Sequence, residues 1–297
     1  MTLANLLVIG AMKSGTTSLH RYLNLHPEIQ MAGPKELNFF VKPEDCLVPQ
    51  GDWHRGLDWY RQWFAGDYPV RGESSHHYSA HPVIRGASDR AAQIVPDARL
   101  IYIVRDPVER IVSHYMERRI DGLESRPLEE VMVEALAAPE MNTYICRSLY
   151  FMQASRWLER FPRDRLLVLA FEDLRDRPVE TLRRAFRFLE VDETFMSDEF
   201  HRNANPSSQR LEPKPSMARL ERLRRRRGAR KRTIAPRQLV PARARGALRA
   251  AWRGAAMRST DRPELSTETR ERLAKLVRDD AERLRELTEE RYPGWSV

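Results

Sequence analysis

The chain has little cysteine and no long apolar run. Cys46 and Cys146 are its two cysteines in 297 residues, and no C-x-x-C pair or Cys/His cluster has the spacing of metal ligands. This scarcity argues against a disulfide-stapled fold and against a zinc site, so we expect no metal. The longest apolar runs have the length of strands, far below the roughly 20 residues that a membrane-spanning helix needs. The composition therefore predicts a protein without a transmembrane segment in a reducing compartment, the cytoplasm.

Acidic residues are scarce in one segment only. Sixteen Lys/Arg residues and a single acid, Glu221, lie between Lys214 and Arg258, in a chain whose formal net charge is +9. The rest of the chain is therefore net acidic. An arginine run attracts phosphates, but no nucleic-acid recognition motif or series of stacking aromatics accompanies this one. We expect a solvated helix face or a flap here, and no nucleic-acid partner.

Apolar runs alternate with helical patterns along most of the chain. This alternation is typical of the α/β class, with a mainly parallel central sheet and helices on both faces. The predicted strands are 3–9, 70–73, 100–104 and 166–170. The predicted helices are about 16–25, 82–94, 147–160, 178–189 and 266–290, and a further helix begins at Pro107. We expect one domain over 1–297, with a core over about 1–192, a loop and basic segment over about 203–262, and a last helix over about 266–290.

The junction after the first strand carries the strongest functional signal. The apolar run ends at Gly10, and a second glycine, Gly15, stands just before a helix start. Unpaired N–H groups at a helix start favour an anion, and the glycines let the chain turn tightly around it. In the nucleotide-triphosphate P-loop, G-x-x-x-x-G-K-[ST], a lysine follows the second glycine; here Lys13 precedes it and Thr16 takes the lysine position. The junction predicts a phosphate cradle that is not a Walker A loop.

Two segments together resemble the sulfotransferases that use 3′-phosphoadenosine 5′-phosphosulfate (PAPS). The first loop is similar to that family's G-x-x-K-[SG]-G-[TS] pattern. Residues 100–115 resemble its 3′-phosphate element, a strand that ends in R-[DN]-P and leads into a helix carrying a serine. The resemblance covers about residues 3–192 and is strongest toward the heparan-sulfate/carbohydrate type and bacterial sulfotransferase domains. It implies a P-loop-like three-layer sandwich.

The resemblance implies roles at both phosphates of the nucleotide. Lys13 would stabilise the charge that develops on the leaving phosphate, while Arg105 and Ser113 would hold the 3′-phosphate. A fork-shaped guanidinium suits phosphate well. The stretch after residue 203 resembles the family's late loop, although its R-K-G signature is not visible. The predicted nucleotide site comprises Gly10, Met12, Lys13, Ser14, Gly15, Thr16, Thr17, Ser18, Arg105, Ser113, Arg210 and Lys214.

The base that takes the acceptor proton stays open between a glutamate and two histidines. Residues 34–40 resemble the K-E-x-x-[FY]-F segment of the heparan-sulfate type, which implies Glu36 as base with Lys35 beside the transferring group. His76 and His77 are rivals, because residues 72–78 lie where relatives carry a G-E-x-S-P-x-Y segment along the acceptor site. The aryl and steroid branch of the family uses a histidine as base. Ordinary roles compete as well: an ion pair between Lys35 and Glu36, and core packing for the histidines.

Two long segments carry no clear periodicity, 41–68 and 116–144, and we expect them to be irregular and to determine the acceptor. The aromatic residues within 53–68 either line the acceptor pocket or pack a surface subdomain. Neither the acceptor's identity nor the oligomeric state follows from the sequence.

The sequence thus predicts a PAPS-dependent sulfotransferase that moves a sulfuryl group in line, without a metal, and releases 3′-phosphoadenosine 5′-phosphate (PAP). The acceptor would be a hydroxyl of a carbohydrate, glycolipid or natural product, with an amine as the second alternative. The lack of the anchor and stalk of Golgi relatives favours a bacterial cytosolic enzyme.

Two other functional classes compete with the sulfotransferase. A P-loop nucleotide kinase or NTPase would share the cradle, but no lysine follows Gly15 and no strand-terminal Asp is placed for magnesium. A non-catalytic binder of anionic polymers would depend on the basic segment 214–258.

Overall fold

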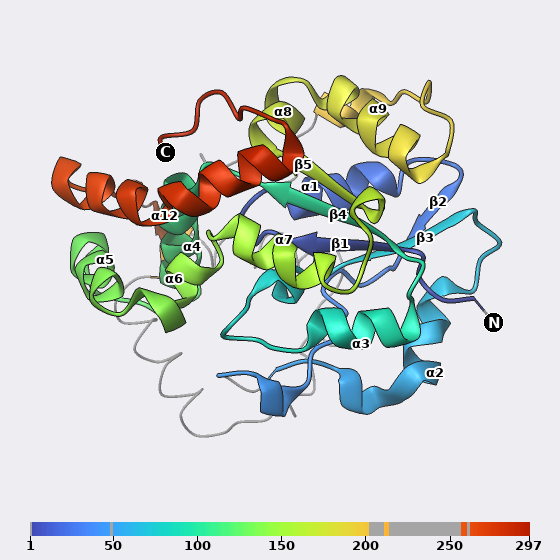
Figure 1. Ribbon diagram of the computed structural model, residues 1–297, viewed down its shortest axis with the longest axis horizontal. Helices are drawn as coiled ribbons and strands as arrows, with labels where there is room; N and C mark the ends of the chain where they lie inside the picture. The colour runs from blue at the N-terminus through green and yellow to red at the C-terminus, as the bar shows by residue number, and fades with distance from the viewer. Residues whose placement is uncertain (1, 48–49, 202–210, 214–256, 260–261) are drawn as a thin grey trace, which may run out of the picture.

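The computed structural model describes residues 2–47, 50–201, 211–213, 257–259 and 262–297. Its centre is a five-stranded sheet with the strand order β2-β3-β1-β4-β5, in which every neighbouring pair is parallel. The strands are β1 (Leu6–Gly10), β2 (Ile29–Met31), β3 (Val70–Ser74), β4 (Arg99–Val104) and β5 (Leu166–Ala170). The predicted parallel α/β architecture is confirmed (Figure 1).

Alternate strand residues feed two separate cores, because successive side chains of a strand point to opposite faces. Leu7 and Ile9 of β1 belong to one core, and Leu6 and Val8 belong to the other. The first face is covered by α3 (Ala87–Ile94), α7 (Tyr150–Leu158) and the end of α12 (Thr267–Thr288). The second is covered by α1 (Thr16–Leu23), α8 (Phe171–Asp176) and α9 (Pro178–Leu189). The sheet is therefore the middle of three layers.

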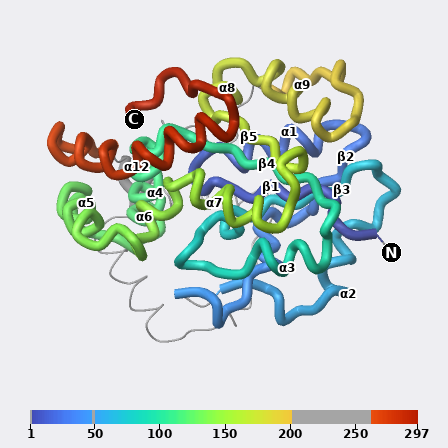
Figure 2. The backbone as a smooth tube through the Cα atoms, in the orientation of Figure 1, coloured from blue at the N-terminus to red at the C-terminus, as the bar shows by residue number. Residues whose placement is uncertain are grey.

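A third cluster of helices stands at the end of the sheet toward which the strands run (Figure 2). It joins α4 (Pro107–Ile120), α5 (Leu128–Ala137), α6 (Thr143–Cys146) and the first half of α12. A two-stranded antiparallel sheet, β6 (Leu211–Pro213) with β7 (Met257–Ser259), has β6 beside α4. Ligands of open α/β sheets bind at the carboxyl ends of the strands, so this cluster borders the candidate site.

The structure differs from the sequence-based expectation in three places. The helix predicted over 82–94 begins at Ala87, because Gly86, with φ 70°, stands before it and Ile84 pairs with Cys46 in an isolated bridge. The segment 116–144, expected to be irregular, contains the end of α4 and all of α5. Strand β2 at the edge of the sheet was not predicted at all.

The aromatic segment 53–68 packs against the core and forms α2 (Gly56–Arg61) between short 3-10 turns. Tyr60 and Phe64 are fully buried, and the ring of Tyr60 stacks on Phe39 at 4.3 Å between centroids. The Tyr60 hydroxyl also donates to the buried Glu73 carboxylate at 2.9 Å. Of the two alternatives for these aromatics, packing is therefore the one that holds for Tyr60 and Phe64.

Asp280 of α12 caps α7 from outside that helix. Its carboxylate accepts hydrogen bonds from the N–H groups of Phe151 at 2.9 Å and Met152 at 2.8 Å, while burial raises its pKa to about 6. We expect Asp280→Ala to lower the free energy of unfolding by about 1–2 kcal/mol, because two N–H groups of α7 lose their acceptor. Urea unfolding measures this change. The exposed neighbour Asp279 is the matched control, and an equal loss in Asp279→Ala would contradict the capping role.

Candidate active site

The first loop leaves β1 through three residues in the left-handed region. Gly10 has φ 145°, Lys13 has φ 70° and Gly15 has φ 91°. A Cβ atom on Gly10 would lie 2.0 Å from Oγ of Ser79, so no side chain fits there. The Ala11 N–H donates to the Ile103 carbonyl at 2.6 Å, which ties the loop to β4. Positive φ at a non-glycine residue costs free energy, and Lys13 keeps it only because its surroundings fix the loop.

The start of α1 presents unused hydrogen-bond donors. Gly15 precedes the helix without a side-chain cap, and the first backbone bond runs from the Leu19 N–H to the Gly15 carbonyl at 3.0 Å. In the part of the chain that the structure describes, the N–H groups of residues 15–18 donate to no acceptor. Four open donors at the positive end of a helix form an anion cradle, and a nucleotide phosphate fits it.

Lys13 reaches from this loop to α4. Its Nζ lies 2.8 Å from Oε1 of Glu117, and both side chains are partly buried. Ser113, which is 3% exposed, stands one helical turn before Glu117 on the same helix. Residues four apart share a face of a helix, so Ser113 lies on the face of α4 that Lys13 reaches. The two motifs that the sequence places about ninety residues apart therefore meet.

Arg105 follows directly after β4 and faces the same loop. Its Nη1 donates to the Lys13 carbonyl at 3.3 Å, and its guanidinium lies 4.9 Å from the centre of the Phe171 ring. Among the described residues, the carboxylate nearest to it is that of Glu109, which is 3.9 Å away and also binds Arg262 and Arg270. Burial lowers the pKa of Arg105, and nearby Arg262 lowers it further. Arg105 is thus a largely buried cation with a shared and distant counter-ion, as an anion site requires.

The R-D-P motif also has the structural role that competes with binding. Asp106 caps α4 by accepting from the Glu109 N–H at 2.8 Å, and Pro107 occupies the first turn. The Asp106 N–H donates to Oε1 of Glu172 at 3.0 Å. Capping uses Asp106 and Pro107 only. Capping leaves the Arg105 side chain available, so the capping role of the motif is compatible with phosphate binding by Arg105.

Glu36, Lys35 and His76 form one cluster. The Glu36 N–H donates to the Ser74 carbonyl at 2.9 Å, which holds the segment along the end of β3 despite a φ of 64° at Glu36. Oε1 of Glu36 contacts Nζ of Lys35 and lies 2.8 Å from Nδ1 of His76. Burial alone would raise the pKa of Glu36, but His76 and Lys35 lower it well below its ordinary value. The predicted ion pair of Lys35 and Glu36 is therefore present, and a histidine joins it.

His77 is held by a buried arginine. Arg147 is 4% exposed, and its guanidinium lies 3.0 Å from Nδ1 of His77 and donates to the His76 carbonyl at 3.3 Å. The rings of His76 and His77 are 4.3 Å apart. Burial lowers the pKa of both imidazoles, and Arg147 acts in the same direction. The two histidines are therefore neutral at neutral pH.

A family model described as "Sulfotransferase domain" matches residues 3–234. The chain belongs to this sulfotransferase family. Bifunctional heparan sulfate N-deacetylase/N-sulfotransferase 2 of Homo sapiens is 26% identical over 208 residues, which cover 64% of this chain and 22% of the relative. Bifunctional heparan sulfate N-deacetylase/N-sulfotransferase 3 of Mus musculus is 32% identical over 198 residues, with the same shares.

The chain spans only about a fifth of the length of these curated relatives, which are 22% covered. Among solved structures, a sulfotransferase from Alicyclobacillus acidocaldarius superposes with a TM-score of 0.70 at 24% identity, and both chains are covered completely. At that identity the likeness concerns the fold. It agrees with the predicted P-loop-like sandwich, and sulfuryl transfer is the reaction of the sulfotransferase family.

Several residues of the candidate site had no signal in the sequence. Glu117 contacts Lys13, and Arg147 contacts His77. Tertiary packing alone brings these pairs together. His20 on α1 lies 2.9 Å from Oγ of Ser74, and burial together with Lys35 lowers its pKa to about 4. Phe171 packs under Gly15, where an added Cβ would meet its ring at 2.8 Å. The predicted Arg210 and Lys214 lie outside the described residues, as does most of the basic segment.

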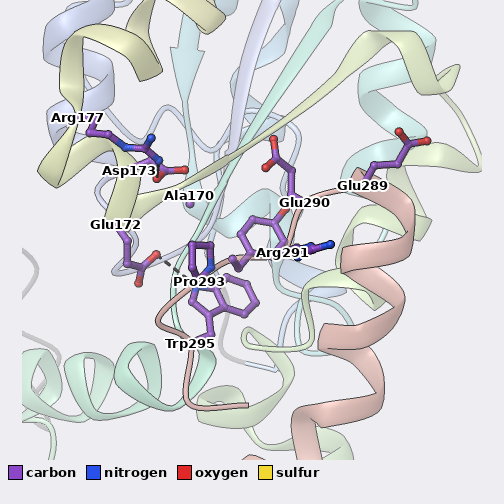
Figure 3. A pocket seen from close by; sticks show the side chains of 10 residues that line it. Ala170, Glu172, Asp173, Arg177, Glu289, Glu290, Arg291, Pro293 and Trp295 are labelled. Atoms are coloured by element: carbon purple, nitrogen blue, oxygen red, sulfur yellow. Dashed lines mark hydrogen bonds and ion pairs between the residues drawn. The ribbon is translucent and has the colours of Figure 1, made fainter.

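A cavity of about 400 Å³ opens beside the carboxyl end of β5 (Figure 3). Glu172 stands at its edge and accepts from Nε1 of Trp295 at 3.3 Å, and Trp295 stacks on Tyr292 at 4.4 Å between centroids. The remaining lining residues are Ala170, Asp173, Arg177, Glu289, Glu290, Arg291 and Pro293. Among the described residues, none of those predicted for the nucleotide or the base lines it, so it differs from the site predicted from the sequence.

No helix in the described ranges is both long and apolar enough to span a bilayer, and no group of three or more His, Cys, Asp or Glu side chains there is arranged to hold a metal ion.

Glu73 anchors the segment that carries the two histidines. Its carboxylate is fully buried and accepts from the hydroxyls of Tyr60 at 2.9 Å, Tyr78 at 2.7 Å and Ser75 at 2.7 Å. Burial raises its pKa from 4.5 to about 7, although the three hydroxyls oppose the change. The folded protein therefore binds this proton more tightly than the unfolded chain does.

The raised pKa of Glu73 predicts a pH dependence of stability. Its contribution is complete below pH 4.5 and is lost as the pH rises through about 7, so the free energy of unfolding should decline across this window. Glu73→Gln, which stays neutral, should flatten the decline in urea unfolding measured at several pH values. Glu130→Gln on the exposed side of α5 is the control. A decline of the same size in wild type and Glu73→Gln would assign it to other groups.

Proposed function

We propose that this chain transfers a sulfuryl group from PAPS to an acceptor hydroxyl and releases PAP. One observation carries the proposal: the open N–H groups of residues 15–18, Lys13 and the weakly paired Arg105 converge at the carboxyl edge of the sheet. Two anion sites at neighbouring strand ends suit a nucleotide that carries phosphates on both its 5′ and 3′ positions. Membership in the sulfotransferase family supports the same donor.

The proposed roles follow the positions of the residues. The loop from Gly10 through Met12 and Ser14 to Ser18 would hold the 5′-phosphate, with Thr16 and Thr17 as hydroxyl and N–H donors. Lys13 would stabilise the charge on the leaving phosphate oxygen, and its ion pair with Glu117 keeps it at the loop. Arg105 and Ser113 would hold the 3′-phosphate. Arg210 and Lys214 remain proposed nucleotide contacts.

The acceptor side is proposed at the cluster of Lys35, Glu36, His76 and His77. His76 and His77 follow β3, the neighbour of β1, and the Glu36 N–H bond to the Ser74 carbonyl holds the segment after β2 at the end of the same strand. The Ser75 N–H donates to the Val8 carbonyl at 3.1 Å, so the cluster adjoins the first loop. A base beside the transferring group is what the acceptor hydroxyl needs. We propose a carbohydrate, glycolipid or hydroxylated natural product as acceptor. Because the relatives are named N-sulfotransferases of heparan sulfate, an amine of a polysaccharide belongs among the acceptors to be assayed.

We further propose that the chain forms one sulfotransferase domain and works in the cytoplasm. The contacts of α12 with α4, α5 and α7 support the first point, because the last helix shares a core with the nucleotide side. The free state of Cys46 and Cys146 supports the second, since thiols persist in a reducing compartment.

Titration calorimetry with PAP, PAPS and ATP tests the function. We expect PAP and PAPS to bind tightly, ATP with magnesium to bind weakly without turnover, and Lys13→Ala to weaken PAPS. Lys275→Ala, on the exposed face of α12, is the control for a lost positive charge. Magnesium-dependent ATP turnover would favour the kinase class. Binding of polyanions without any binding of PAP would favour the non-catalytic class.

A further inference from the structure

The Glu36 carboxylate is saturated with donors. Oε1 contacts Nζ of Lys35 and lies 2.8 Å from Nδ1 of His76, and Oε2 accepts from the His76 N–H at 2.9 Å. A carboxylate that receives three N–H groups is stabilised as the anion, which makes it a poor proton acceptor. The lowered pKa of Glu36 agrees with this geometry.

The same contacts fix the proton of His76. An ionised carboxylate only accepts hydrogen bonds, so Nδ1 of His76 must carry the hydrogen that faces Glu36. A neutral imidazole protonated on Nδ1 has its lone pair on Nε2. Within the described ranges, the hydrogen bonds and ion pair of His76 use its backbone N–H, its carbonyl and Nδ1, and none uses Nε2. His76 therefore has a free basic nitrogen, Nε2. The contact of Nδ1 with Glu36 fixes the orientation of the ring.

His77 is fixed in the opposite tautomer. The guanidinium of Arg147 only donates, so Nδ1 of His77, 3.0 Å from it, must be the acceptor. The hydrogen of a neutral His77 then sits on Nε2. This histidine has no lone pair left for a substrate proton, but its Nε2–H can donate a hydrogen bond.

We propose that His76 is the catalytic base, that Glu36 is the residue that positions it, and that the Nε2–H of His77 donates to the acceptor. The proposal rests on the proposed sulfuryl transfer. In that step the acceptor oxygen bonds to sulfur while its proton moves to Nε2 of His76. The bond from sulfur to the 5′-phosphate oxygen breaks, and its electron pair leaves with PAP. The arrangement is a carboxylate-oriented histidine, the same logic by which an aspartate orients the histidine of hydrolase triads.

Charged and titratable groups surround His76 on several elements. Glu36 and Lys35 face it from the segment after β2, His77 from its own turn, Arg147 from the end of α6 and His114 from α4. Burial, Arg147 and Lys35 lower the pKa of His76 from 6.5, and Glu36 opposes them. The ring is therefore neutral, as a base must be, at neutral pH.

Nuclear magnetic resonance of the ring nitrogens tests the tautomers directly, without an acceptor. In full-length protein labelled with ¹⁵N-histidine, assigned through His76→Gln and His77→Gln, we expect His76 protonated on Nδ1 and His77 on Nε2. Glu36→Ala should abolish the preference at His76 and leave that of His77 unchanged. A wild-type His76 protonated on Nε2 would overturn the proposal.

A sulfotransferase slowly transfers the sulfuryl group of PAPS to water. The rate of this reaction can be measured without an acceptor, as PAP formed per unit time. We expect His76→Gln to lower this rate by about 100-fold, the usual contribution of a general base, and His77→Gln to lower it by less than about 10-fold. Calorimetry with PAP should give unchanged affinity in both variants. If the wild type does not bind PAP, the sulfotransferase proposal itself is refuted. If His76→Gln and wild type react at equal rates, only the assignment of His76 as the base is refuted.

The pH profile separates His76 from Glu36. The rate should fall on the acidic side of pH 6.5, with the same midpoint that the resonance of His76 gives. A rate that stays constant down to pH 4.5, while the His76 resonance titrates, would show that a group with a lower pKa takes the proton and would overturn the proposal.

Discussion

Replacing Arg105 with alanine should weaken the binding of PAP by about 2–4 kcal/mol, because a buried phosphate would lose a charged, forked donor. The structure makes this loss large for two reasons. Arg105 is 16% exposed, so water replaces the guanidinium poorly, and its counter-ion Glu109 lies 3.9 Å away and is shared. Little intramolecular pairing is therefore broken when a ligand anion arrives. Calorimetry with PAP measures the change.

The loss of affinity in Arg105→Ala should be specific to ligands that carry a 3′-phosphate. Adenosine 5′-phosphate lacks the 3′-phosphate, so its affinity should hardly change in Arg105→Ala. Arg105→Lys keeps the charge but not the fork, and it should fall between wild type and alanine. Arg160→Ala, an exposed arginine paired with Asp89, is the control for net charge. Equal losses for both ligands would contradict the assignment of Arg105 to the 3′-phosphate.

Replacing Gly10 with alanine should lower the free energy of unfolding by about 2–5 kcal/mol, through strain at a positive φ and overpacking. Gly10 has φ 145°, and a Cβ would lie 2.0 Å from Oγ of Ser79 and 3.3 Å from the Tyr102 ring. Any relief must shift the first loop against the turn that carries His76 and His77. We therefore expect weaker PAP binding as well, under conditions where the variant is folded.

Two variants separate the causes of the Gly10 effect in urea unfolding. Gly122 also has a positive φ, 68°, but a Cβ there meets nothing within 4 Å, so Gly122→Ala reports backbone strain alone, about 1–2 kcal/mol. The double variant Gly10→Ala/Ser79→Gly removes the Oγ contact and should recover part of the loss. A Gly10→Ala effect no larger than that of Gly122→Ala would show that the close approach to Ser79 is not what demands glycine.

The sheet was predictable where the pattern is local. The apolar runs at β1, β4 and β5 are completely or nearly completely buried, and such runs identify central parallel strands. Strand β2 has only three residues, Ile29–Met31, too few for any periodicity. The start of α3 depends on a bridge between Ile84 and Cys46, a contact across nearly forty residues that no window of sequence contains.

The site divides in the same way. A glycine after an apolar run and R-D-P after another are local signals, and the structure brings Lys13 and Arg105 together as expected. What the sequence left open was the relation among Glu36, His76 and His77. Only the folded chain shows which nitrogen of each ring faces a carboxylate and which faces a guanidinium. Tertiary packing sets the direction of these side chains, so residue identity alone could not predict the partners of the two histidine rings.

The central proposal is that two strand ends hold the two phosphates of one nucleotide. A crystal structure of the full chain with PAP tests it most directly. We predict the 5′-phosphate on the N–H groups of residues 15–18 beside Lys13, and the 3′-phosphate on Arg105 and Ser113. PAP bound elsewhere, for example in the cavity beside Trp295, with the first loop free of phosphate, would contradict it.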